Sequence, residues 1–112
     1  MAEGQHRDIL RVIEPGLWNL RMRDGSESER ICLMNARPLI QLRHPALRCR
    51  QIVVNQDEDE LTIQYACSGQ GFGRTRLRIE SPRLIQVETQ GVAGKSPFDF
   101  AVEARRVGAC NG

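Results

Sequence analysis

Apolar and polar residues alternate over short stretches of this chain, and turn-forming residues separate the stretches at the ~8–12-residue spacing typical of all-β folds. The clearest stretch is 73–90, where one hairpin register pairs Leu77 with Val87 and Arg76 with Glu88. That register places the apolar residues on one face and the charged residues on the other, as a sheet with one buried face requires. The alternation therefore predicts a fold built from antiparallel hairpins.

A first hairpin is expected over 17–33, with its turn at 24–27, where Gly25 supplies a positive φ. A register centred on Gly25-Ser26 gives three pairs: Trp18 with Leu33, Leu20 with Ile31, and Met22 with Glu29. Upstream of it, residues 8–13 are expected to form either an extra edge strand or a helical turn.

A second hairpin is expected to join strands at 48–55 and 61–67 through an acidic loop at 56–60. Its symmetric register sets three pairs opposite each other: Gln51 with Tyr65, Val53 with Ile63, and Cys49 with Cys67. A last strand is expected over 98–107, after a loop at 91–97.

Four cysteines, Cys32, Cys49, Cys67 and Cys110, favour a disulfide framework if the protein is extracytoplasmic. Opposed residues of an antiparallel pair have Cα atoms ~4.5–5.5 Å apart, within the range a disulfide needs. The register of the second hairpin therefore permits a Cys49–Cys67 bridge, which leaves Cys32–Cys110 by elimination. Four cysteines allow three connectivities, so this pairing is a hypothesis.

Residues 36–43 are predicted to form the one helix, because Asn35 is a good N-cap, Pro38 is tolerated in the first turn and His44-Pro45 ends it. The predicted fold class is mainly β: an antiparallel up-and-down curved sheet, as a half-barrel or small sandwich, with one short α-helix. The predicted core consists of Trp18, Leu20, Ile31, Val53, Ile63, Leu77, Ile79, Ile85, Val87, Phe100 and Val102.

The length of 112 residues fits a single domain, with 1–8 expected to be a disordered N-terminal segment. No apolar run approaches the ~20 residues needed to span a bilayer. Polar residues follow Met1, so no signal peptide is present in this sequence. Together with the cysteines, this favours the mature part of a bacterial periplasmic or secreted protein whose signal peptide has been removed.

The charge balance argues against nucleic-acid binding, because the formal net charge is only +2 and aromatic residues make up 4% of the chain. Arg74, Arg76 and Arg78 alternate on the predicted outer face and form a candidate anion-binding face for lipid headgroups, anionic polysaccharide or an acidic protein. The alternative is a solvated charged face, because Gln86, Glu88 and Gln90 lie opposite these arginines in the predicted register.

No arrangement of residues typical of catalysis is evident, so we predict that the protein is not an enzyme, with no catalytic residue, metal or cofactor. The only histidines are His6, in the terminal segment, and His44, expected on the surface. The cysteines lack the short Cys-x-x-Cys spacing of zinc sites. The acidic loop at 56–60 lacks calcium-loop spacing, and the glycine-rich 69–73 is expected to be a corner between strands rather than a phosphate-binding loop.

Four short motifs occur in order along the chain: Pro15-Gly16-Leu17-Trp18, Cys32-Leu33, Tyr65-Ala66-Cys67-Ser68-Gly69 and Arg105-Arg106-Val107-Gly108-Ala109-Cys110. This ordered set, covering roughly residues 12–110, resembles an uncharacterised family of small exported proteobacterial proteins known as domain of unknown function 3617. The resemblance implies a periplasmic location and four paired cysteines. It implies no known activity and supplies no catalytic residue.

The leading functional hypothesis is a non-enzymatic periplasmic binding or interaction module, whose partner would be an apolar small ligand or another envelope protein. Such a ligand suits the open end of a cupped sheet, and a partner chain suits an exposed strand edge. One alternative is a small cell-envelope hydrolase that uses Asp or Glu residues in a cleft. Another is a metal-binding module that uses the thiols.

Overall fold

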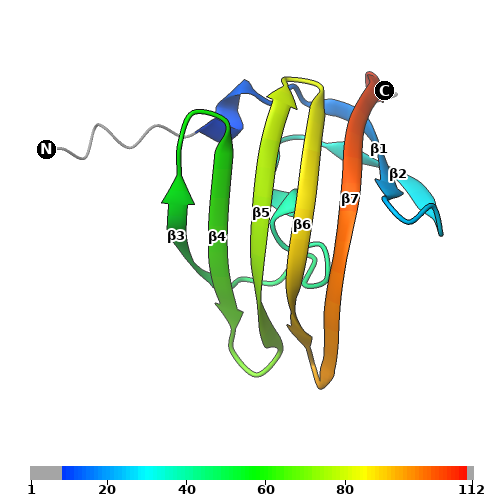
Figure 1. The fold of residues 1–112 in the computed structure, drawn as a ribbon. Coiled ribbons are helices and arrows are strands. Elements are labelled where there is room, and N and C mark those ends of the chain that lie inside the picture. The colour runs from blue at the N-terminus through cyan, green and yellow to red at the C-terminus, as the bar shows by residue number, and fades with distance from the viewer. Residues whose placement is uncertain (1–8, 111–112) are drawn as a thin grey trace, which may run out of the picture.

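The computed structural model describes residues 9–110, which form one open sheet of seven antiparallel strands (Figure 1). The strands are β1 (Gly16–Met22), β2 (Ser28–Leu33), β3 (Arg50–Gln56), β4 (Glu60–Cys67), β5 (Gly71–Ser81), β6 (Leu84–Ala93) and β7 (Ser96–Gly108). Their order across the sheet is β2-β1-β7-β6-β5-β4-β3, so β2 and β3 are the two edges. The predicted mainly β antiparallel class is confirmed, as a single open sheet rather than a sandwich. The predicted N-terminal segment at 1–8 lies outside the described residues.

The registers predicted from polarity are confirmed in two hairpins. In β5 and β6 every predicted pair is present, including Leu77 with Val87 and Arg76 with Glu88. In β3 and β4 the predicted pairs Gln51–Tyr65 and Val53–Ile63 are present as well. The loop predicted at 91–97 is wrong: β6 continues to Ala93 and β7 begins at Ser96, because Gly94, with φ 64°, lets the chain reverse in a tight turn.

The first hairpin forms, but its predicted register is wrong by two residues. Trp18 lies opposite Ile31, and Leu20 lies opposite Glu29. A two-residue shift keeps every side chain on its original face, so apolar alternation cannot distinguish the two registers. Backbone hydrogen bonds in the turn select the observed one, because the amide of Met22 donates to the carbonyl of Glu27 over 2.9 Å.

The predicted α-helix at 36–43 is wrong. Helical structure in the described residues is limited to two 3₁₀ helices, η2 (Ile9–Val12) and η3 (Arg37–Leu39). Residues 8–13 were expected to form an edge strand or a helical turn, and η2 is the helical turn. At 36–43 the backbone makes the short-range hydrogen bonds of a 3₁₀ turn, such as Ile40 to Arg37 at 3.0 Å, and the carbonyl of Ile40 instead accepts from the hydroxyl of Thr75 over 2.6 Å. Such tertiary contacts override local helix propensity.

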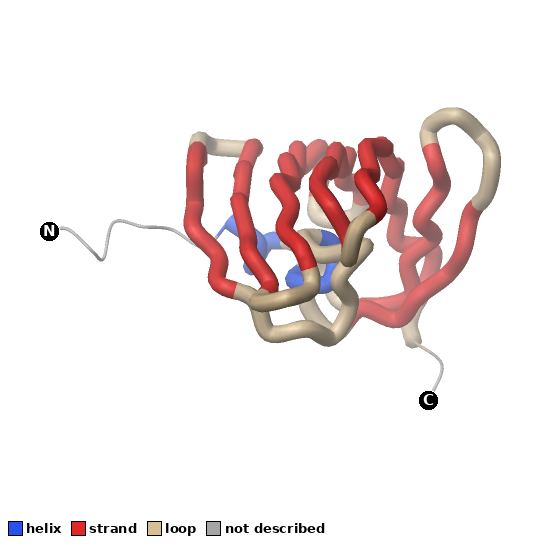
Figure 2. Tube along the Cα trace, turned by 90° about the horizontal axis from the view of Figure 1, so that it is seen from below, coloured by secondary structure: helices blue, strands red, loops and turns tan. Residues whose placement is uncertain are grey.

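Residues 34–49 connect β2 at one edge of the sheet to β3 at the other, and we call them the crossing segment. The crossing segment, which contains η3, lies together with η2 against one face of the sheet, which we call the inner face (Figure 2). Leu39 and Ile40 are fully buried there. The side chain of Gln41 satisfies the carbonyls of His44 and Leu47 over 3.1 Å each. An irregular segment can therefore cover this face without leaving these buried carbonyls unpaired.

The core lies between the inner face and the crossing segment. Seven of the predicted core residues are buried: Trp18, Leu20, Ile63, Leu77, Ile85, Val87 and Val102. Ile31, Ile79 and Phe100 are partly buried against the core. The prediction of Val53 is wrong, because this residue lies on edge strand β3 and its side chain is 43% exposed.

Two disulfides hold the two ends of the crossing segment to the sheet. Cys32, near the end of β2, is bonded to Cys110, and Cys49, just before β3, is bonded to Cys67 at the end of β4. The pairing hypothesised from the hairpin register is therefore present. Because each bond lies next to one end of the crossing segment, the pair fixes where this segment enters and leaves the inner face.

Candidate functional site

The outer face of the sheet, opposite the crossing segment, carries an apolar row of side chains. Near the β4–β5 and β6–β7 turns, four residues on adjacent strands lie side by side: Ala66, Phe72, Val92 and Pro97. Arg50 continues this row at the β3 edge. The next row along the strands is mostly polar: Ile52, Gln64, Arg74, Gln90 and Asp99. The alternation that predicts a polar outer face therefore fails at this end of the sheet.

A hollow of about 770 Å³ lies over these two rows, and we call it the outer hollow. Large apolar side chains line it without being covered: Ile52 is 62% exposed and Phe72 is 54% exposed. Polar groups from Arg50, Arg74 and Asp99 stand beside them. An apolar hollow with a few polar groups, in the ~300–1,000 Å³ range, is the usual form of a small-molecule site.

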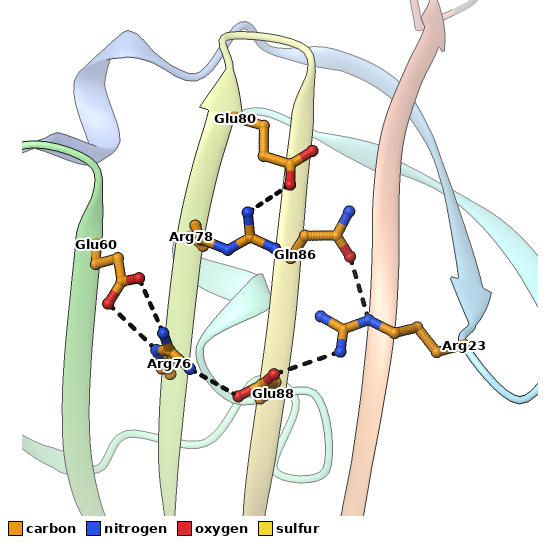
Figure 3. Close-up of polar contacts among 7 residues, drawn as sticks. All are labelled: Arg23, Glu60, Arg76, Arg78, Glu80, Gln86 and Glu88. Carbon is orange, nitrogen blue, oxygen red and sulfur yellow. Dashed lines mark hydrogen bonds and ion pairs between the residues drawn. The ribbon is translucent and has the colours of Figure 1, made fainter.

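The rest of the outer face is dominated by ion pairs (Figure 3). Arg76 donates to both carboxylate oxygens of Glu60, at 3.3 and 2.9 Å, and to Glu88 at 3.2 Å. The second oxygen of Glu88 accepts from Arg23 at 3.3 Å. Arg78 is paired with Glu80 at 2.6 Å. Two of the three arginines predicted as an anion-binding face are therefore already occupied by carboxylates.

Ion pairs on this face lower the pKa of two carboxyl groups, Glu60 and Glu103. The hydrogen bond from Arg76 holds the pKa of Glu60 below its ordinary value. The pKa of Glu103 is lowered as well, chiefly by its hydrogen bond from Arg105 and also by Arg21. Both carboxylates are consequently ionised at neutral pH, and their roles are structural pairing on a solvated face.

Arg74 differs from Arg76 and Arg78. Within residues 9–110 it makes no ion pair, and the same holds for Arg50 and Asp99. Arg74 and Asp99 lie on the same row but are separated by strand β6, where Gln90 lies between them. The outer hollow is therefore bordered by two guanidinium groups and one carboxylate that are not neutralised by neighbours.

His44 was expected on the surface, and this is wrong: it is 2% exposed, in the crossing segment against the inner face. Its Nδ1 lies 2.8 Å from the hydroxyl of Tyr65, and its Nε2 lies 3.0 Å from the carbonyl oxygen of Gln70. A carbonyl only accepts, so Nε2 carries the proton. In the neutral ring Nδ1 is then the acceptor, and the Tyr65 hydroxyl donates to it.

Two glycines of β5 make room for this contact, because a Cβ on Gly71 would come within 2.9 Å of Nε2 of His44 and Gly73 lies next to Tyr65. Gly73 and Gly91 lie opposite each other on the inner face of β5 and β6, next to Tyr65 on β4. A Cβ on Gly73 would overlap the ring and hydroxyl of Tyr65. The ring of Tyr65 therefore occupies the place of the missing side chain, and burial raises the pKa of its hydroxyl. Tyr65, Gly73 and Gly91 are also among the residues that line the outer hollow, so the His44–Tyr65 contact is adjacent to it.

Other candidate chemistry has no support in the described part of the chain. All four cysteines are bonded to each other, so no thiol is left to ligate a metal or act as a nucleophile. Between residues 9 and 110 no group of three or more metal-ligating side chains is gathered in one place. The glycine-rich 69–73 covers the end of the β4–β5 turn and the start of β5, and a strand follows the turn, not a helix. None of the helices in this range has the length and apolarity that crossing a membrane would require.

The comparison with protein families gives one result. Residues 13–110 match the model of a protein of unknown function, DUF3617, so the family resemblance found in the motifs is correct and the chain belongs to the DUF3617 family. No curated protein and no solved structure matches this chain. The family carries no assigned activity, so the functional argument depends on the geometry of the outer hollow.

Proposed function

We propose that this protein is an exported, non-enzymatic binding module, and that its outer hollow binds a small apolar ligand bearing an anionic group. The observation that carries the proposal is the exposed apolar lining of the hollow beside Arg50 and Arg74, which make no ion pair within residues 9–110. Burying Ile52 and Phe72 under a ligand would remove apolar surface from water at a gain of ~25 cal/mol per Å². Arg50 and Arg74 would supply charge-assisted hydrogen bonds to a carboxylate, sulfonate or phosphate.

The proposed location is the periplasm or another oxidising compartment. Two disulfides support it, because cytosolic thiols are ordinarily kept reduced. A ligand with an apolar body and an acidic group is also the kind of molecule that an envelope protein meets, since it partitions between membranes and water.

The non-enzymatic character is supported by how the outer-face carboxylates are used. Asp99 and Glu88 both line a second hollow next to the first. An acid–base pair would need both groups to face a substrate, yet each oxygen of Glu88 already accepts from an arginine. Asp99 alone does not supply the paired carboxylates that a glycoside-type hydrolysis requires.

Fluorescence titration with two related probes tests the proposal. 8-Anilinonaphthalene-1-sulfonate has an aromatic body and an anionic group, and N-phenyl-1-naphthylamine has a similar body without the charge. We expect the sulfonate to bind more tightly, and Arg74→Ala to weaken it about 3–10-fold while leaving the neutral probe nearly unchanged. Phe72→Ser should weaken both probes.

Val107→Ser is the matched control, because Val107 is a similarly exposed apolar residue outside the hollow, at 45% exposure. It should leave both titrations unchanged. Equal loss in Phe72→Ser and Val107→Ser, or no binding of either probe up to about 1 mM, would contradict the proposal.

A further inference from the structure

The two edges of the sheet differ in how they are protected. Edge strand β2 is short and exposes Ser28, Glu29 and Arg30, which are the polar and charged residues that discourage a second chain from pairing. Edge strand β3 exposes three consecutive apolar side chains instead. Ile52 is 62% exposed, Val53 43% and Val54 42%. An unpaired edge of this composition is a template for strand addition.

One protective feature is present on β3, but it covers only part of the strand. The pairing of β3 with β4 is irregular between Val53 and Asn55, which marks a bulge at Val54. Arg50, Gln51, Ile52 and Val53 precede the bulge and keep a regular register with β4. Among the described strands none pairs with the outer side of β3, so a regular segment that includes Ile52 and Val53 remains open to another strand.

The charges at the two ends of β3 indicate that the strand added to this edge is β3 of a second copy of the chain. Arg48 and Arg50 lie at its start, and Asp57, Glu58 and Asp59 form the turn directly after its end. Two copies of β3 that pair antiparallel around Val53 set Arg48 of each copy opposite Glu58 of the other, so the basic start of each copy lies beside the acidic turn of the other. Parallel pairing would instead set like charges side by side, which is unfavourable.

We propose that β3 pairs antiparallel with β3 of a second copy of this chain, so that two sheets join into one across a two-fold axis. Such a contact is self-complementary: Arg48 of one copy meets Glu58 of the other, and the reverse contact follows by symmetry. It covers Ile52, Val53 and Val54 on both copies. Ile52 also lines the outer hollow, but the inference is argued from the edge strand and its charges and does not need the proposed ligand.

Charge reversal tests this pairing by sedimentation velocity, without any ligand. The contact is small, so we expect reversible dimerisation that increases between about 10 μM and about 1 mM protein at low salt. Arg48→Glu alone, or Glu58→Arg alone, should weaken association about tenfold or more by setting like charges opposite each other. The double variant, Arg48→Glu with Glu58→Arg, should restore it to within about threefold of the parent chain.

Arg48 and Glu58 are exposed and make no ion pair within residues 9–110, so these variants should keep the fold. Arg30→Glu on the opposite edge is the matched control and should leave the dimer unchanged. A chain that stays monomeric over the whole concentration range overturns the proposal. Failure of the double variant to restore association also overturns it, as would an equal effect of Arg30→Glu.

Discussion

The hydroxyl of Tyr65 lies 2.8 Å from Nδ1 of His44, and this contact joins strand β4 to the crossing segment in the interior of the protein. On its other side the imidazole donates to the carbonyl of Gln70 in the β4–β5 turn, at 3.0 Å. The ring of His44 thus links the crossing segment, β4 and the β4–β5 turn, and its partner Tyr65 is one of the residues that line the outer hollow. These buried hydrogen bonds fix the position of Tyr65 next to the hollow.

Removing the Tyr65 hydroxyl tests this contact. Tyr65→Phe keeps the ring but leaves the buried Nδ1 of His44 without its donor, which should lower the free energy of unfolding by about 1–3 kcal/mol. Urea unfolding at neutral pH measures the change. An unchanged midpoint would mean that water replaces the hydroxyl and that the contact does not stabilise the fold.

Tyr65→Phe should also change how the free energy of unfolding depends on pH. Burial raises the pKa of Tyr65 in the folded state, so folding favours the neutral phenol. This stabilisation is complete below the unfolded pKa of about 10 and is lost as the pH rises through the folded pKa. The parent chain should lose stability over that alkaline range, whereas Tyr65→Phe should lose less. Parallel curves for the two proteins would contradict the assignment.

Gly73→Ala should be costly for a steric reason, since its Cβ would overlap the ring of Tyr65. We expect about 1–3 kcal/mol of destabilisation. Gly108→Ala is the matched control, because a Cβ there meets no atom within 4 Å. In a Tyr65→Ala background the penalty of Gly73→Ala should largely disappear, and a penalty of the same size in both backgrounds would argue against the overlap.

The two disulfides should contribute unequally. Cys32–Cys110 spans 78 residues of sequence and Cys49–Cys67 spans 18. In the chain-entropy model the longer loop is worth about 4–5 kcal/mol and the shorter about 3 kcal/mol. Replacing each pair with serines and measuring urea unfolding compares them directly. A larger loss from Cys49–Cys67 would contradict the order that loop length predicts.

The Glu60–Arg76 pair should produce a modest loss of stability in acid. The pKa of Glu60 is lowered from 4.5 in the folded protein, so its contribution is present above pH 4.5 and disappears as the pH falls through the folded pKa. Glu60→Gln should therefore be less sensitive than the parent chain between neutral pH and acid. The effect at pH 7 should be small, because the pair is exposed to solvent. Urea midpoints at several pH values measure it.

Local pattern predicted the sheet well where the turn and the polarity agree. The β5–β6 register followed from a short turn at 81–83 and strict alternation on both strands. The predicted register of the first hairpin was wrong because a shift of two residues leaves the apolar–polar alternation unchanged. The prediction of a helix at 36–43 was wrong because hydrogen bonds from distant residues, such as Thr75 to Ile40, determine the backbone conformation there.

The candidate site was harder to predict, although two sequence signals pointed to it. Phe72 is an apolar residue on the otherwise polar face of β5, and it lies in the outer hollow. Gly71 and Gly73 lie two residues apart at the start of β5, and their missing side chains leave space on the inner face for large neighbours. That Tyr65 and His44 fill this space depends on the path of the crossing segment, which local pattern does not encode.

Mapping a bound ligand by two-dimensional nitrogen–proton NMR tests the central claim most directly. On titration with 8-anilinonaphthalene-1-sulfonate, the backbone amides of Ala66, Phe72 and Val92 should shift together and saturate, while those of the distant β1–β2 hairpin stay unchanged. Shifts confined to the crossing segment on the inner face, or spread evenly over the sheet, would contradict a binding site in the outer hollow.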